Sequence, residues 1–259
     1  MNHDMTSPLV QIFRACRLLL HIVSGLTQAF IYPHVAQTLQ RRMTQNWSAG
    51  LLGILNIKLR VHGDLPDVEK GAVMLAANHV SWLDVYSLNA ASPAHFVAKA
   101  EIARWPVLGW LSRQVGTLFI ERAKRSDTAR INQDIAAALA KGDRVAVFPE
   151  GTTSDGNTLR HFHASLLQPA VLGGAWLYPA AIRYTDARGN FSTATAYVDI
   201  SMQDSLRQIL RQPLLHVDIT FAAPIHSPGK NRRELARAAE QAIASALSLP
   251  LPHSGLPPK

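Results

Sequence analysis

Residues 72–84 read AVMLAANHVSWLD, an apolar run that leads directly into a histidine and, five residues later, an aspartate. The apolar run predicts a buried strand, and Ser81 followed by Asp84 predicts a helix start through a capping box, which would leave His79 as a loop residue. A chemical interpretation competes with this one, because strand ends in α/β proteins often carry reactive groups. If the turn bends His79 back over Asp84, the carboxylate fixes the imidazole tautomer and stabilises the imidazolium.

Beyond this stretch, short apolar runs alternate with amphipathic segments. The expected strands span residues 57–62, 73–77, 95–98, 115–120, 144–149, 177–183 and 215–221, and the expected helices span residues 82–91, 103–113, 127–141, 164–172 and 231–247. This alternation predicts an α/β domain over residues 57–248, with a mostly parallel or mixed central sheet flanked by helices. The Pro- and Gly-rich sequence LPLPHSGLPPK predicts a disordered tail over residues 249–259.

Residues 1–56 form a separate unit in the sequence pattern, in which residues 9–31 and about 36–56 predict two helices. No Lys, Arg, Asp or Glu occurs from Leu18 to Gln40, and basic residues flank this charge-free interval, namely Arg14, Arg17, Arg41 and Arg42. Its apolar part covers about fifteen residues, fewer than the roughly 20 that a membrane span needs. We therefore expect an antiparallel two-helix hairpin associated with the membrane interface. The alternative is that both helices pack on the domain as ordinary core helices.

Composition excludes several classes of protein. The 47% hydrophobic content rules out general disorder, and the single cysteine rules out an intrachain disulfide. HExxH, a Gly-rich phosphate loop and G-x-S-x-G are missing, which argues against metalloprotease, P-loop and serine-hydrolase classes. The net charge of +8 indicates an anionic partner. The tryptophans lie mostly in apolar stretches, which favours an anionic membrane over nucleic acid.

Two further strand ends carry chemistry-bearing residues. FIERAKRSD, at residues 119–127, places Arg122 after one expected strand, and FPEGTTSDG, at residues 148–156, follows another. Each has an ordinary alternative, a solvated basic surface in the first case and an Asp-Gly turn in the second. Ends of parallel strands meet at one edge of a sheet, so we expect both segments to lie near His79.

Taken in order, these segments resemble the motifs of the glycerolipid acyltransferase family, whose type member is lysophosphatidate acyltransferase. NHVSWLD resembles its H-x4-D motif, FIER the second motif, FPEGT the third, and YPAAI at residues 178–182 the fourth. The resemblance covers residues 73–184. EGTTSDG is also similar to bacterial lyso-ornithine lipid acyltransferases.

The resemblance implies transfer of a fatty acyl group from acyl-CoA or acyl-carrier protein to a lipid hydroxyl, without a cofactor or metal. His79 would be the base and Asp84 its partner. The acceptor head group would be bound by Arg122, Glu150, Gly151, Thr152 and Thr153, with support from Asn78, Lys99 and Pro179. The implied location is the cytoplasmic face of the inner membrane, as a peripheral or monotopic protein bound to an anionic surface, with no nucleic-acid partner.

Two departures from the family pattern bear on the acceptor. Users of lysophosphatidate commonly have arginine and lysine where this chain has Thr153 and His163. The sequence ranks lysophosphatidate first and lyso-ornithine lipid as the alternative. A catalytically silent lipid-binding protein is a rival class, against which the complete set of His79, Asp84 and Glu150 argues.

Overall fold

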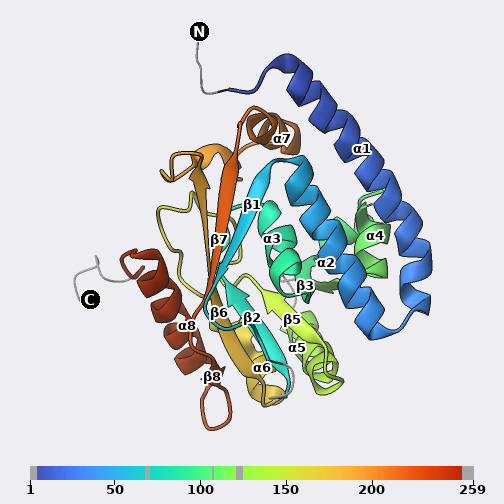
Figure 1. Cartoon of the computed structure of the whole chain (residues 1–259). Helices are drawn as coiled ribbons and strands as arrows, with labels where there is room; N and C mark the ends of the chain where they lie inside the picture. Colours follow the sequence, from blue (N-terminus) through green and yellow to red (C-terminus); the bar gives the residue numbers. More distant parts are fainter. Residues whose placement is uncertain (1–4, 68–70, 107, 121–124, 253–259) are drawn as a thin grey trace.

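The computed structural model describes residues 5–67, 71–106, 108–120 and 125–252 (Figure 1). The α-helices are α1 (Pro8–Ile31), α2 (Gln37–Ile54), α3 (Leu83–Ala91), α4 (Leu108–Gln114), α5 (Arg125–Ala140), α6 (Gln168–Leu172), α7 (Met202–Leu210) and α8 (Arg232–Leu247). The strands are β1 (Ile57–His62), β2 (Val73–Ala77), β3 (His95–Lys99), β4 (Leu118–Ile120), β5 (Arg144–Val147), β6 (Trp176–Asp186), β7 (Leu215–Phe221) and β8 (Ile225–His226).

The described strands form one eight-stranded mixed sheet with the order β1-β7-β6-β2-β5-β3-β4, and β8 pairs with β6. The five strands from β6 to β4 in this order run parallel, whereas β7 runs antiparallel to β6 and carries β1 alongside it. Helices cover both faces of the sheet (Figure 1). The predicted α/β class with a mixed, mostly parallel sheet is therefore confirmed.

β2 is the central strand, and the apolar sequence quoted above accounts for its place. All five of its residues are buried, as a strand covered on both faces requires. Alternate side chains enter opposite halves of the core. Leu75 and Ala77 join the cluster on the side of α2 and α3, while Met74 and Ala76 join the cluster on the side of α5 and α8. β2 therefore delivers the residues after Ala77 to one edge of the sheet.

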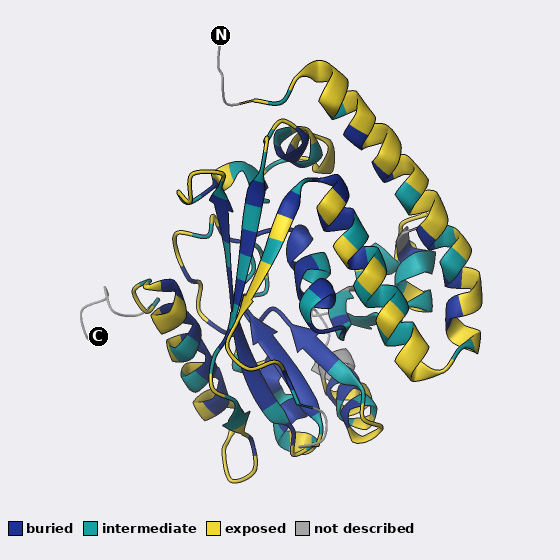
Figure 2. Ribbon diagram, viewed as in Figure 1, coloured by how far each residue is buried: buried dark blue, intermediate teal, exposed yellow. Residues whose placement is uncertain are grey.

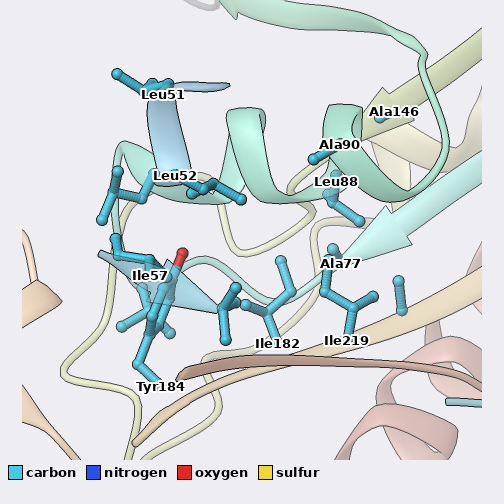
Figure 3. Packing of buried hydrophobic residues seen from close by; sticks show 14 of the residues in the cluster. Leu51, Leu52, Ile57, Ala77, Leu88, Ala90, Ala146, Ile182, Tyr184 and Ile219 are labelled. Atoms are coloured by element: carbon cyan, nitrogen blue, oxygen red, sulfur yellow. The ribbon is translucent and has the colours of Figure 1, made fainter. Parts of the chain in front are cut away.

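The two N-terminal helices have different environments. α2 lies against α3, and Leu51, Leu52 and Leu55 at its C-terminal end belong to the same hydrophobic cluster as the sheet (Figure 3). α1 runs along the outside of the molecule and is exposed over most of its surface (Figure 2). The C-terminal end of α2 is therefore part of the hydrophobic core. In contrast, α1 forms an exposed apolar surface on the outside of the molecule.

α1 and α2 pack closely through a pair of stacked rings and a glycine. The His21 and Trp47 rings stack with centroids 4.6 Å apart, and each side chain bonds the other residue's carbonyl. A Cβ at Gly25 would meet the Trp47 ring at 2.6 Å, so glycine is needed for this close approach. The predicted helix pair is thus present, and its packing is specific.

Arg14 does not face outward as the membrane-surface prediction required. It is buried, and its guanidinium donates to the carbonyls of Leu210, Gln212 and Pro213. These carbonyls end α7, where a helix leaves acceptors without intrahelical partners. Of the other basic residues around the charge-free interval, Arg41 donates to the Gly142 carbonyl, and Arg17 and Arg42 are exposed. The expectation that all four arginines lie on the surface is therefore wrong for Arg14.

Two elements were not predicted from the sequence. α7 begins at a Ser201 cap whose hydroxyl accepts from the Asp204 amide, a signal that lies in the sequence but was overlooked. The two-residue strand β8 pairs with β6 and is too short for any periodicity. The expected helix over residues 103–113 divides into a 3-10 turn at Ala100–Arg104 and α4.

Candidate active site

His79 and Asp84 meet in the structure. His79 Nδ1 lies 2.9 Å from Asp84 Oδ2, and the Asp84 side chain is completely buried whereas that of His79 is 20% exposed. On a regular helix two residues five apart are rotated by about 140° and do not meet. Residues 78–82 precede α3 as a non-helical turn, which folds the imidazole back over the first turn of the helix. The contact engages Nδ1 and leaves Nε2 as the nitrogen that can take a proton.

The helix-start interpretation of Asp84 also holds, because one carboxylate does both tasks. Oδ2 accepts from the backbone N–H groups of Val80, at 2.6 Å, and Ser81, at 2.9 Å, as a residue in the first turn of a helix does. The other oxygen, Oδ1, accepts from the Tyr184 hydroxyl at 2.7 Å. A buried carboxylate is costly unless its oxygens are bonded, and four donors offset that cost here.

The rest of His79 is fixed from the other side by the loop after β5. The Phe148 ring stacks on the imidazole with centroids 4.0 Å apart and planes 10° from parallel. Glu150 Oε1 accepts from the His79 N–H at 2.7 Å, and Ser154 N donates to the His79 carbonyl at 2.7 Å. The third motif and the loop that follows it therefore hold both backbone groups of the histidine.

Glu150 is engaged entirely with backbone. Its second oxygen, Oε2, accepts from the Arg160 N–H at 3.0 Å, and the residue is only 3% exposed. Burial raises its pKa to about 7, although the two backbone N–H groups favour the carboxylate form. Gly151 follows with a φ of 78°, a conformation that suits glycine and that turns the chain beyond Glu150. This geometry favours a positioning role for Glu150 over the direct head-group contact expected from the sequence.

Thr152 and Thr153 differ in their surroundings. Thr152 is exposed at the rim of the loop. The Thr153 hydroxyl donates to the Tyr197 carbonyl, and the Tyr197 N–H donates to the Val80 carbonyl at 2.9 Å. Thr153 thereby joins the third motif to the turn that carries His79.

The three supporting residues expected from the sequence lie on or next to strands of the sheet. The Asn78 side chain forms a pair of hydrogen bonds with the backbone of Ile182 in β6, at 2.7 and 3.0 Å. Pro179 lies in β6 between the segments that pair with β8 and β7, and its carbonyl accepts from the Ala222 N–H. A backbone N–H at this position would point to the same side of β6, where neither β8 nor β7 pairs with Pro179. The proline therefore removes no hydrogen bond from the sheet. Lys99 is the last residue of β3.

Arg122 lies outside the described residues, so the structure neither places it at this site nor excludes it. His161 contacts Glu240 of α8, with Nδ1 and Oε2 3.2 Å apart, and His163 is exposed. The structure thus brings together His79, Asp84, Glu150 and the threonine loop. Tyr184 and Ser154 were missed, because their contacts come from strand and loop positions far away in the sequence.

A cavity of about 160 Å³ lies between α1, α2, α3 and α4. Its lining includes Trp47, Tyr86 and Phe96. The Phe96 ring lies 5.7 Å from that of Phe148, which in turn stacks on His79. One aromatic layer therefore separates this mainly helix-lined cavity from the imidazole.

The fold and the His79–Asp84 dyad define an α/β protein that carries a histidine beside a buried carboxylate at the end of its central strand. A protein-family model described as "Acyltransferase" matches residues 58–183, which include both residues of the dyad. With the relatives described next, this match shows that the chain belongs to the acyltransferase family, and the protein is an acyltransferase of lipid biosynthesis.

Curated relatives cover most of the chain. A lyso-ornithine lipid O-acyltransferase of Pseudomonas aeruginosa is 39% identical over 209 residues, which are 81% of this chain and 80% of that protein. A 1-acyl-sn-glycerol-3-phosphate acyltransferase of Neisseria meningitidis is 39% identical over 172 residues, covering 66% and 67% of the two chains. The crystal structure of the 1-acyl-sn-glycerophosphate acyltransferase of Thermotoga maritima shares the fold, with a TM-score of 0.70, 18% identity and coverage of 93% and 94%.

Proposed function

We propose that this enzyme moves a fatty acyl group from a thioester, acyl-CoA or acyl-carrier protein, to the free hydroxyl of a lysolipid. His79 Nε2 takes the hydroxyl proton as the oxygen attacks the thioester carbonyl, and Asp84 stabilises the imidazolium. The new C–O bond replaces the C–S bond, and the proton passes from His79 to the departing sulfur. The single observation that carries this mechanism is the 2.9 Å contact between His79 Nδ1 and Asp84 Oδ2.

As the acceptor we propose lyso-ornithine lipid. The match to the Pseudomonas aeruginosa relative extends over 209 residues, against 172 for the Neisseria meningitidis relative at the same identity. Thr153 and His163 replace two cations that a doubly charged phosphate monoester would use, whereas lyso-ornithine lipid presents a single carboxylate. Lysophosphatidate is the second candidate, favoured by the Neisseria meningitidis relative and by the exposed side chain of Arg160.

The enzyme is proposed to act at the membrane interface, on the cytoplasmic face, where thioester donors are supplied. With its 3-10 extension, the first helix spans Pro8–His34 and is long and apolar enough to cross a membrane, with a mean hydropathy of 1.5. However, α1 contacts α2, α4 and α7, so it lies across the protein surface. This packing supports an in-plane arrangement, and the adjacent cavity is suited to an apolar acyl chain.

An acceptor competition tests the proposal. Purified enzyme receives lysophosphatidate and lyso-ornithine lipid with the same acyl donor, and we expect lyso-ornithine lipid to react faster. Thr153→Arg should shift the ratio of kcat/KM values toward lysophosphatidate by about tenfold, since one charged hydrogen bond contributes about 1.5 kcal/mol or more.

Thr153→Val is the matched control, because it removes the hydrogen bond to Tyr197 without adding charge. Preference of the wild-type enzyme for lysophosphatidate would overturn the proposed acceptor. Equal ratios for the Arg and Val variants would remove Thr153 from the head-group site.

A further inference from the structure

Tyr184 of β6 reaches the Asp84 carboxylate from the face of the sheet on which α3 packs. Its hydroxyl donates to Asp84 Oδ1 at 2.7 Å, the oxygen that His79 does not use, and both side chains are completely buried. Figure 3 shows the ring among apolar side chains that include Ile57, Ile182 and Ile219, with its oxygen on the side of α3. A phenylalanine would fill the same space, so only the hydroxyl is specific to tyrosine here.

The register of the sheet explains how Tyr184 arrives there. β2 ends its pairing with β6 at Ala77 and Ala180, and β6 continues to Asp186. Tyr184 lies on the same face of β6 as Ala180, two alternations further along, and so passes beneath the first turns of α3. It meets Asp84 and also Ser87, one helical turn later, whose Oγ is 3.3 Å from the Tyr184 oxygen.

The direction of these bonds follows from proton counting. Tyr184 has one hydroxyl proton, which goes to Asp84, so Ser87 donates to the Tyr184 oxygen. Burial, and then the charge of Asp84, raise the pKa of the Tyr184 hydroxyl well above its ordinary value. The phenol is therefore neutral near neutral pH and can donate its proton to Asp84.

We propose that Tyr184 is a positioning residue for acyl transfer, which holds the Asp84 carboxylate in the plane that directs Oδ2 at His79. The inference rests on the proposed role of His79 as the base. Through this bond Tyr184 also shares the negative charge of Asp84, which sets how strongly the carboxylate stabilises the imidazolium. Loss of the hydroxyl leaves Oδ1 without this donor, so that the carboxylate is held through Oδ2 alone and its charge is less shared.

Several ionisable groups surround the imidazole and would affect its titration. Asp84 of α3 and Tyr184 of β6 act from one side, and Glu150 and Arg160 act from the loop after β5, where the pKa of Glu150 is itself raised to about 7. A pH–rate profile would mix these titrations. The protonation of His79 is therefore best read directly, from the NMR signal of its Cε1–H, assigned by its loss in His79→Ala.

The test compares Tyr184→Phe with the wild-type enzyme, with Ile219→Val of β7 as a control in the same buried cluster that removes one core methylene and leaves the carboxylate untouched. In Tyr184→Phe we expect kcat to fall about tenfold or more at nearly unchanged KM. We also expect the Cε1–H signal of His79 to move at a fixed pH, because the carboxylate that bonds its imidazole has lost a donor. Ile219→Val should leave both quantities unchanged.

Each outcome decides between roles. Unchanged kcat and an unchanged His79 Cε1–H signal in folded Tyr184→Phe would overturn the inference, and so would a loss of kcat without a change in this signal, which indicates packing alone. Activity retained by His79→Ala would instead overturn the proposed base. The two failures are therefore distinguishable.

Discussion

At the residue scale, the site depends on two buried carboxylates with different tasks. Asp84 has four donors and holds the imidazole, whereas Glu150 bonds two backbone N–H groups and holds the chain on either side of the site. Replacing a buried, hydrogen-bonded carboxylate leaves its donors unsatisfied. This lowers the free energy of unfolding by more than the loss of an average surface contact does. Both residues therefore fix the geometry of His79, although only Asp84 bonds its imidazole.

The raised pKa of Glu150 predicts a particular dependence of stability on pH. Between the ordinary value of 4.5 and about 7, the folded protein holds a proton that the unfolded chain has lost. The resulting stability is fully present below about pH 4.5 and is lost as pH rises through 7, by at most about 3 kcal/mol.

Denaturant unfolding of wild-type and Glu150→Gln protein between pH 4.5 and 7.5 measures this effect. The wild-type advantage in free energy of unfolding should shrink as pH rises. Glu101→Gln, at an exposed carboxylate, should show no such trend. A wild-type advantage that grows with pH would contradict the raised pKa.

At the element scale, local pattern predicted more than long-range contact. The run AVMLAA predicted β2 within its observed bounds, and the signals after it predicted α3 to within one residue. The sequence also named His79 and Asp84 as a pair, since the chain itself brings them within five residues. Tyr184 and the backbone partners of Glu150 were not predictable in this way, because sheet register and loop closure create those contacts.

The N-terminal helices show the same division. Their extents were predicted to within two residues, from charge gaps and proline. The burial of Arg14 was not, because its partners are carbonyls at the end of α7, about 200 residues away in the sequence. Arginine at a membrane-flanking position and arginine that caps a distant helix look identical in sequence.

Replacing Arg14 should therefore loosen α1 and destabilise the protein. Arg14→Gln is expected to lower the free energy of unfolding by about 2 to 4 kcal/mol, since buried carbonyls lose a charged donor. Arg17→Gln, three residues away and exposed, should change it by no more than about 0.5 kcal/mol. Thermal and urea unfolding in detergent measure both effects. Equal effects of the two variants would show that the bonds from Arg14 to the end of α7 do not stabilise the fold.

At the scale of the whole molecule, one side carries an apolar surface that the rest of the protein leaves uncovered. Leu9 is 79% exposed, Phe13 61% and Leu20 69%. An amphipathic helix of this kind binds the bilayer interface through its apolar face. Each exposed cation near an anionic surface adds only about 1 kcal/mol, and Arg14 is not among them. Attachment should therefore be mainly hydrophobic.

Polar substitutions on α1 test this attachment while leaving the folded core intact. Deletion of residues 9–56 would not serve, because it removes Leu51, Leu52 and Leu55 from the core. A triple Leu9→Gln, Phe13→Gln, Leu20→Gln variant should lose at least about tenfold in affinity for vesicles, since each buried leucine contributes about 1.5 to 3 kcal/mol. Arg17→Gln with Arg42→Gln should weaken binding less. Vesicle sedimentation at low and high salt measures both, and undiminished binding of the triple variant would place the attachment elsewhere.

The most direct test of the mechanism is the acyl-transfer rate of folded His79→Ala protein, measured with its thermal melting and beside Asp84→Asn. We predict that His79→Ala loses at least about 10²-fold in kcat with a near-normal melting temperature, because the base is gone while the turn is still held by Glu150 and Ser154. Asp84→Asn should lose nearly as much, since a neutral amide does not stabilise the imidazolium. Near-normal turnover by folded His79→Ala protein would contradict the assignment of His79 as the base.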